Sequence, residues 1–277
     1  MIGVGIIGFN RPHYMRRLFM SLEAQTDLHD VDFHLYLDGP VNQSSGIVYA
    51  EQKDIDACAR MFARAKLPNK WLHTREHNVN IGIASFEATE ELTGIYERVM
   101  QLEDDLVLSP DWFRLARILY RELEDHPDVY SFSPGFQRMF PKVQDRLHID
   151  RVTYAWHHMW CECFTADRWL RIRDEYMEYH ELIVGPDYLE RFEGPLKELY
   201  ARKGMQPMHA RSQDGGREMA IRLNGMRRAR TAVNRAIGIG LEGIHFSPVV
   251  FELMGFTNQT PFFFDEDAAR ESFEWDD

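Results

Sequence analysis

The sequence predicts an α/β fold in which a mostly parallel sheet is flanked by helices. Strand-like and helix-like segments alternate through the first half of the chain, an order typical of parallel strands joined by right-handed crossovers. The 277 residues are 44% hydrophobic and 13% aromatic, so the chain can bury a sizeable core. No repeat or linker interrupts the sequence, and we therefore expect a single domain over residues 1–277.

The elements of the first half follow from hydrophobic periodicity and turn residues. Apolar and alternating stretches predict strands at 4–9, 31–39, 70–77, 99–109 and 129–133. Amphipathic spacing predicts helices near 12–24, 49–65 and 83–96, and a fourth that begins at Pro110 with Ser109 as its N-cap. Pro12 suits the first turn of the first helix, because a backbone N–H has no helical partner there.

The second half is less regular. An aromatic segment at 154–164 precedes a helix that is expected from about Asp167, and a stretch with several glycines and prolines follows at 184–200. The basic residues that come later are interpreted as a solvated helix face rather than as a diphosphate-binding segment: Arg227, Arg228, Arg230 and Arg235. Residues 261–277 are interpreted as an acidic tail.

Composition and charge exclude several classes of protein. The net charge is −12, from 44 acidic and 32 basic residues, which argues against a general nucleic-acid binder. No apolar run approaches the length of a membrane span, and no signal peptide is visible. Three cysteines cannot form a disulfide framework. We therefore expect a cytoplasmic α/β enzyme.

Two motifs suggest cofactor sites but do not fit them. Gly3, Gly5 and Gly8 have G-x-G-x-x-G spacing, yet apolar residues lie among these glycines and no strand precedes them, so the segment is itself a strand. The segment HHMWCEC at 157–163 combines adjacent histidines with C-x-C, which is not the spacing of structural zinc ligands. Neither a dinucleotide fold nor a zinc site is expected.

Three adjacent acids, Glu103, Asp104 and Asp105, interrupt an apolar run and are the most informative feature. An ionised carboxylate buried without a partner costs several kcal/mol, so such a cluster needs a cation or strong hydrogen-bond donors. Carboxylate oxygens suit Mg²⁺ or Mn²⁺, which complete their shells with phosphate oxygens and water. We favour a metal–phosphate site over a solvated loop, and expect it at the carboxyl ends of the strands.

An ordered set of motifs resembles the GT-A glycosyltransferases, particularly N-acetylglucosaminyltransferase I and related bacterial sugar transferases. LEDDLVLSPDWF is similar to their D-x-D-type metal motif, and GFNRPHYMRRLFMSL to their first strand with its Asn10-Arg11 turn. DFHLYLDGP resembles their second strand, and NVNIGIASFEATEEL the helix start before the metal motif. The similarity is good over roughly 3–115 and weaker to about 250.

The resemblance implies roles for these residues. Asp105 would coordinate the divalent cation, and Glu103 and Asp104 would face ribose and donor-sugar hydroxyls. The nucleotide would be held by Arg11, with Asn10 in the same turn, and by Asp38, whose carboxylate could accept the imide N–H of uracil. The remaining donor-binding residues would be those that open the third helix, Asn80, Gly82 and Ser85. A surface ion pair for Arg11, and simple helix capping for Asn80 and Gly82, remain alternatives.

The resemblance also suggests a catalytic base and acceptor contacts in the second half. Asp214 corresponds to the base, although the acidic pair of the family is reduced here to Gln213-Asp214. An ordinary helix-capping aspartate is the alternative. His245 would complete the metal shell. Trp156 and Trp160 would form an acceptor-sugar platform, with core packing as the alternative.

Together these features predict a metal-dependent glycosyltransferase with a GT-A fold. Residues 1–125 would bind the nucleotide-sugar and metal, and residues 126–260 would form the acceptor and catalytic half. The donor is expected to be UDP-linked, N-acetylglucosamine being suggested by the resemblance, and the acceptor to be a glycan hydroxyl attacked with inversion. A sugar nucleotidyltransferase and a non-catalytic sugar-binding module are the alternatives.

Overall fold

The computed structural model describes residues 1–135, 150–155, 160–207, 209–243, 247–253, 255–258 and 272–276. The strands are β1 (Ile2–Gly8), β2 (Val31–Leu37), β3 (Lys70–Thr74), β4 (Arg98–Glu103), β5 (Leu106–Leu108), β6 (Val129–Ser133), β7 (Arg151–Ala155), β8 (Cys161–Thr165), β9 (Arg227–Thr231), β10 (Ala236–Gly238) and β11 (Glu274–Trp275). The helices are α1 (Pro12–Glu23), α2 (Gln52–Arg64), α3 (Ile81–Ile95), α4 (Trp112–Glu122), α5 (Ala166–Ile183), α6 (Glu193–Arg202), α7 (Gln213–Leu223) and α8 (Pro248–Leu253).

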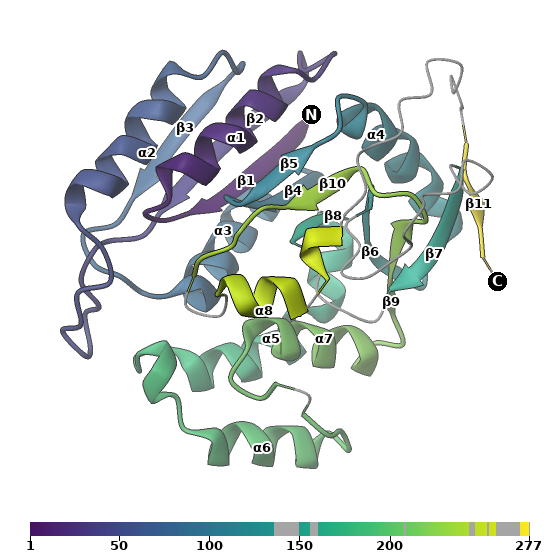
Figure 1. Ribbon diagram of the computed structural model, residues 1–277. Helices are drawn as coiled ribbons and strands as arrows, with labels where there is room; N and C mark the ends of the chain where they lie inside the picture. Colours follow the sequence, from purple (N-terminus) through teal and green to yellow (C-terminus); the bar gives the residue numbers. More distant parts are fainter. Residues whose placement is uncertain are drawn as a thin grey trace.

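Nine of the described strands form one large mixed sheet in the order β11-β7-β9-β6-β8-β4-β1-β2-β3 (Figure 1). Strands β3, β2, β1 and β4 are parallel, and β8 is antiparallel to both β4 and β6. A short second sheet pairs β5 with β10. The chain places β2 and β3 on one side of β1 and then returns to β4 on the other side. A crevice where ligands commonly bind lies beyond the carboxyl ends of β1 and β4.

Helices cover both faces of the sheet, as the alternating segments predict. Every residue of β1 and β2 is buried, as expected for central parallel strands with helices on each side. One buried cluster contains side chains of α1, α2 and α4, and a second contains side chains of α3, α5, α6 and α7. No described helix combines the length and the apolar composition that a membrane crossing requires.

The predicted strands and helices of the first half are confirmed, with corrections at their ends. Gly3, Gly5 and Gly8 lie inside β1, so they form no phosphate-binding turn. Helix α4 begins at Trp112 with Asp111 in the N-cap position, and the predicted cap at Ser109 is wrong. The Ser109 hydroxyl instead donates to Asp111 Oδ1 at 2.6 Å, because the chain is still in the turn that follows β5.

The prediction of a solvated helix for the basic run is also wrong. Residues Arg227–Thr231 form β9, which lies between β6 and β7. Arg228 is fully buried, and its Nε donates to Glu162 on β8 at 2.7 Å. A carboxylate 66 residues away in the sequence makes this arginine compatible with the interior, and the local sequence pattern could not reveal it.

Part of the predicted acidic tail belongs to the sheet. Residues Glu274–Trp275 form β11, which pairs in parallel with β7. The Trp275 indole donates to Glu122 on α4 at 2.9 Å, and its ring stacks on His126. Residues 261–271 and 277 lie outside the described residues.

Candidate functional site

The acidic triplet lies at the crevice between β1 and β4. Glu103 ends β4, Asp104 and Asp105 form a turn, and β5 begins at Leu106. The Asp104 and Asp105 side chains are only 3% and 9% exposed. The triplet is therefore not a solvated loop.

Arg11 is the cation that faces these acids. It follows β1, and its guanidinium forms an ion pair with Asp104 and a second one with Asp105 Oδ2 at 3.0 Å. Although burial opposes the charged form, the two carboxylates raise the pKa of Arg11 above its ordinary value. One guanidinium thus lies between two carboxyl groups whose side chains are almost fully buried. The ion pair that we considered for Arg11 thus exists, but it is part of the site rather than of the surface.

Two oxygens of this turn have no hydrogen-bond partner among the described residues. These are Asp104 Oδ2 and Asp105 Oδ1, and both are inaccessible to solvent. Burial, together with the neighbouring charges of Asp104 and Glu103, raises the pKa of Asp105 to about 7, even though Arg11 opposes the shift. A buried acceptor without a donor is costly, and carboxylate oxygens of this kind are ligands that a hard divalent cation prefers. The residues present therefore fit Mg²⁺ or Mn²⁺.

The segment after β10 covers the acids. The backbone N–H of Ile239 donates to the Asp105 carbonyl at 2.8 Å, and Arg11 Nη1 donates to the Glu242 carbonyl at 3.0 Å. Gly240 packs so closely against the Asp105 carboxylate that a Cβ atom there would overlap it. His245, the predicted second metal ligand, follows this segment and lies outside the described residues.

Asp38 lies at the end of β2, where we expected a nucleotide contact. Its two carboxylate oxygens accept the backbone N–H groups of Gly39, Val79 and Asn80 at 3.0–3.2 Å. Burial raises the pKa of Asp38, against the effect of these donors and of Arg75. Asp38 therefore fixes the loop that leads into α3. The other residue of the first turn, Asn10, points its amide toward the Tyr49 carbonyl at 3.5 Å.

The start of α3 is capped and reinforced. Asn80 has a φ of 69°, and its Oδ1 accepts from the Gly82 N–H at 3.2 Å and from Arg191 Nη2 at 2.5 Å. A Cβ atom at Gly82 would lie 2.9 Å from Arg191 Nη2. The capping role considered for Asn80 is thus confirmed. Ser85, one turn further on, accepts from Gln101 Nε2 at 2.8 Å.

A small, partly open cleft lies beside the triplet, with Glu103 in its lining. It brings together four of the predicted residues, Ser85, Glu103, Trp160 and Asp214. Asp214 lies in the first turn of α7, which is capped by the Ser212 hydroxyl and not by Asp214 itself. The aspartate side chain is thus placed along the cleft. The other lining residues are Ile7, Ile81, Gln101, Glu162, Gln213 and Arg217.

Sequence reasoning missed the charged floor of the cleft. Arg217 Nη1 donates to Glu162 Oε2 at 2.9 Å and to Gln101 Oε1 at 3.0 Å, and both charged side chains are almost fully buried. Arg217 follows Asp214 by three residues and therefore shares its helix face, which was the available signal. Glu162 lies between two buried cysteines on β8, and its strand pattern places it on the same face as Trp160.

Of the two tryptophans predicted to contact an acceptor, the structure describes Trp160. Trp160 lines the cleft and also stacks on Phe256, with ring centroids 5.2 Å apart. It thus serves in packing and in the cleft wall. Trp156 lies outside the described residues, as do His157 and His158.

The mostly parallel mixed sheet with helices on both faces forms a GT-A-like α/β fold. Solved structures share this fold with the chain. The structure of S. aureus TarS 1–349 in complex with UDP-GlcNAc has a TM-score of 0.50 and 13% identity, over 88% of this chain and 60% of that one. The chain spans 35% of a longer TarS structure. The GT-A-like fold that the sequence predicts is confirmed.

Other similarities are weaker. The mannosyltransferase PcManGT from Pyrobaculum calidifontis, in complex with GDP-Man and Mn²⁺, has a TM-score of 0.43 and 13% identity, covering 74% of this chain and 53% of that one. The galactosyltransferase LgtC has a TM-score of 0.40 and 15% identity, over 65% of this chain and 64% of that one. No protein-family model and no curated protein sequence matches the chain.

Proposed function

We propose that the chain is a glycosyltransferase that moves a sugar from a nucleotide-sugar to an acceptor hydroxyl and depends on Mn²⁺ or Mg²⁺. The observation that carries this proposal is the pair of buried, unpartnered oxygens on Asp104 and Asp105 at the crevice between β1 and β4. A cation held there would sit where a donor diphosphate could complete its shell. TarS was solved with UDP-GlcNAc, which makes this the first donor to test.

Binding of the donor would fall to residues of the first half, about 1–125. Arg11 is a cation beside the acids and could contact the diphosphate. Glu103 faces the cleft and could accept hydrogen bonds from ribose or sugar hydroxyls. The start of α3, with Asn80, Gly82 and Ser85, would bind oxygens of the nucleotide-sugar. Asp38 would hold the loop before α3 in place through the backbone N–H of Asn80. In the segment after β10, His245 would add a metal ligand.

Catalysis would use Asp214 in the second half. Its carboxylate takes the proton of the acceptor hydroxyl while the hydroxyl oxygen attacks the anomeric carbon from the face opposite the diphosphate. The bond between the anomeric carbon and the diphosphate oxygen breaks, and the nucleoside diphosphate leaves with the bonding electrons. The metal, when bound, supplies charge stabilisation to that leaving group. Trp160 and Trp156 would bear the apolar face of a glycan acceptor, and the configuration would invert.

The test measures release of free UDP from UDP-GlcNAc, with Mn²⁺ or with a chelator. Wild-type protein should release UDP only with the metal, and Asp105→Asn should lower the rate by a factor of about 10²–10³ because a charged ligand is lost. Asp174→Asn is the matched control, since its side chain is 93% exposed on α5. It should keep the wild-type rate.

Three outcomes would contradict the proposal. Full activity of Asp105→Asn in chelator would remove the metal assignment. Metal-dependent binding of donors without turnover, over a panel of acceptors, would favour a non-catalytic module. Release of pyrophosphate from a nucleoside triphosphate and a sugar phosphate would favour a nucleotidyltransferase.

A further inference from the structure

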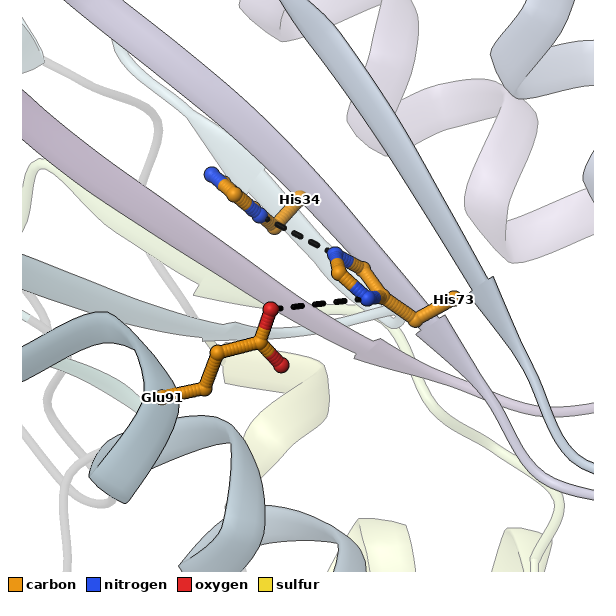
Figure 2. Close-up of side chains that lie close together, drawn as sticks. All are labelled: His34, His73 and Glu91. Carbon is orange, nitrogen blue, oxygen red and sulfur yellow. Dashed lines mark hydrogen bonds and ion pairs between the residues drawn. The ribbon is translucent and has the colours of Figure 1, made fainter. Parts of the chain in front are cut away.

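A second group of ligand-type side chains lies near the β3 edge of the sheet, away from the acidic turn. His34 comes from β2, His73 from the edge strand β3 and Glu91 from α3 (Figure 2). Each offers one ligand atom, and these atoms all lie within 4.8 Å of one another. Among the described residues, no other group of three histidine, cysteine or acidic side chains does so.

Direct contacts join the three side chains. His34 Nδ1 lies 3.0 Å from His73 Nε2, and His73 Nδ1 lies 3.7 Å from Glu91 Oε1 (Figure 2). The register of the parallel pair explains the first contact. His34 is opposite Trp71 and Tyr36 is opposite His73, so the two histidines are diagonal neighbours on one face.

The hydrogen bonds behind His34 determine which of its nitrogens is free for a ligand. Tyr96 donates its hydroxyl proton to Asp32 Oδ2 at 2.8 Å, because an ionised carboxylate can only accept. The Tyr96 oxygen therefore accepts from His34 Nε2, 2.9 Å away. A neutral His34 then carries its lone pair on Nδ1, which lies against His73 Nε2. A second hydrogen bond of this kind is typical of metal-binding histidines.

Stacked rings hold the two imidazoles in place. The Trp71 ring stacks on His34 with centroids 4.9 Å apart and an interplanar angle of 11°. The Tyr36 ring stacks on His73 at 4.3 Å and 12°. Orientation of the ligand rings before binding lowers the entropy that a metal site must overcome.

We propose that His34, His73 and Glu91 form a zinc site. Two imidazoles and a carboxylate are a ligand set of Zn²⁺, whereas Mg²⁺ prefers oxygen ligands alone. Two nitrogens on a tetrahedral zinc lie about 3.3 Å apart, so the observed 3.0 Å pair needs to open only slightly. Glu91 is 41% exposed and can rotate to reach the ion, and water would take the fourth position.

The position of the site suggests a structural role. His73 is 31% exposed, so an ion can enter from solvent, while His34 is buried. A bound zinc would link the edge strand β3 to β2 and α3. Because β3 is an edge strand and pairs with β2 only, such a link would stabilise a strand that has no neighbour on its other side.

The test is titration of the metal-free, untagged protein with Zn²⁺ alone, followed by calorimetry and thermal unfolding. Wild-type protein should bind one zinc per chain and unfold at a higher temperature in its presence. His73→Gln and Glu91→Gln should each weaken binding at least tenfold. Co²⁺ in place of Zn²⁺ should give the visible absorption of tetrahedral nitrogen and oxygen ligation, which both variants should lose.

His29→Gln is the matched control, because His29 is 77% exposed and pairs with Asp27 outside the cluster. This variant should bind zinc as the wild type does. The proposal is wrong if the wild type binds no zinc, or if His73→Gln and Glu91→Gln bind it unchanged. Asp105→Asn should keep this zinc site, so failure of the glycosyltransferase proposal and failure of this one are distinguishable.

Discussion

Asp105 shows at the scale of one residue how burial creates a demand for a cation. A carboxyl group in water is ionised at neutral pH, but burial raises the pKa of Asp105 to about 7. Arg11 reduces the cost of its charge without satisfying Asp105 Oδ1 or Asp104 Oδ2. These two oxygens therefore favour a bound cation at the acidic turn.

Asp214→Asn tests the base. Asparagine keeps the size of the side chain but cannot accept the proton, so turnover should fall by a factor of about 10²–10⁴. Donor affinity, measured by titration without acceptor, should change little because Asp214 is not among the proposed donor ligands. Wild-type turnover in this variant would place the base elsewhere.

His180 makes stability depend on pH. Burial against Phe86, with help from Arg191 and against the effect of Glu90, lowers the pKa of His180 from 6.5 to about 4. The unfolded chain therefore binds a proton that the folded chain does not, so stability falls as pH falls from 6.5 toward 4. At pH 5 this proton uptake lowers the free energy of unfolding by about 1–2 kcal/mol relative to neutral pH.

The variant His180→Leu should lose this part of the pH dependence. Urea unfolding at neutral pH and near pH 5 measures it, as the difference in unfolding free energy between the two conditions. Wild-type protein should lose more stability than the variant on acidification. An equal loss in both proteins would show that His180 does not titrate as argued.

At the scale of elements, α3 connects the parts of the candidate site. Its first residues are held by Asp38 from β2 and by the buried Arg191, which also donates to the Arg211 carbonyl at 2.5 Å before α7. One guanidinium thus fixes the start of α3 relative to the segment that leads to Asp214. Displacement of Arg191 should therefore disturb both the start of α3 and the segment that leads to Asp214.

Two glycines of α3 provide a matched pair of substitutions. Gly82→Ala would place Cβ 2.9 Å from Arg191 Nη2 and 3.2 Å from Ile183, so it should destabilise the protein by about 1–3 kcal/mol. Gly94 has no atom within 4 Å of its Cβ position, and Gly94→Ala should stabilise by about 0.5–1 kcal/mol. Chemical denaturation measures both, and equal effects would contradict the packing argument.

At the scale of the whole molecule, one buried carboxylate joins the two halves of the sheet. Glu162 on β8 lies between Arg217 of α7 and Arg228 of β9, and also accepts from the Ser131 hydroxyl on β6 at 2.8 Å. Strand β8 itself connects β4 to β6. The cleft and the centre of the sheet thus share one charge network.

Glu162→Gln should be strongly destabilising, because it removes the anion that pairs with the buried Arg217 and leaves the buried Arg228 with Glu218 alone. We expect a loss of about 3–5 kcal/mol in the free energy of unfolding. Asp128→Asn is the control, since its ion pair with Arg227 is 43% exposed on each side and should contribute less than about 1 kcal/mol. A similar loss of unfolding free energy in both variants would contradict the argument that the ion pairs of Glu162 matter more because they are buried.

How well the sequence predicted these features depended on the range of the interactions. Strands β1, β2 and β6 and helices α1 and α3 were predicted because their apolar periodicity is local. The ends of elements depend on contacts outside the element, and the N-cap predicted for α4 is accordingly wrong. The basic run was misread because the partner of Arg228 lies 66 residues away.

The sequence by itself determined the alternation of elements, the α/β fold class and the interrupted acidic strand, since each follows from neighbouring residues. The GT-A-like fold was implied by the resemblance of an ordered set of motifs to a known family. Only the tertiary structure decided what the acids contact: Arg11 and Asp104 are 93 residues apart, and the crossovers bring them together. It likewise placed Asp214 and Glu103 in the lining of one cleft, and it used both oxygens of Asp38 for backbone donors. Side-chain periodicity specifies which face is buried, whereas partners on that face depend on how distant strands are ordered.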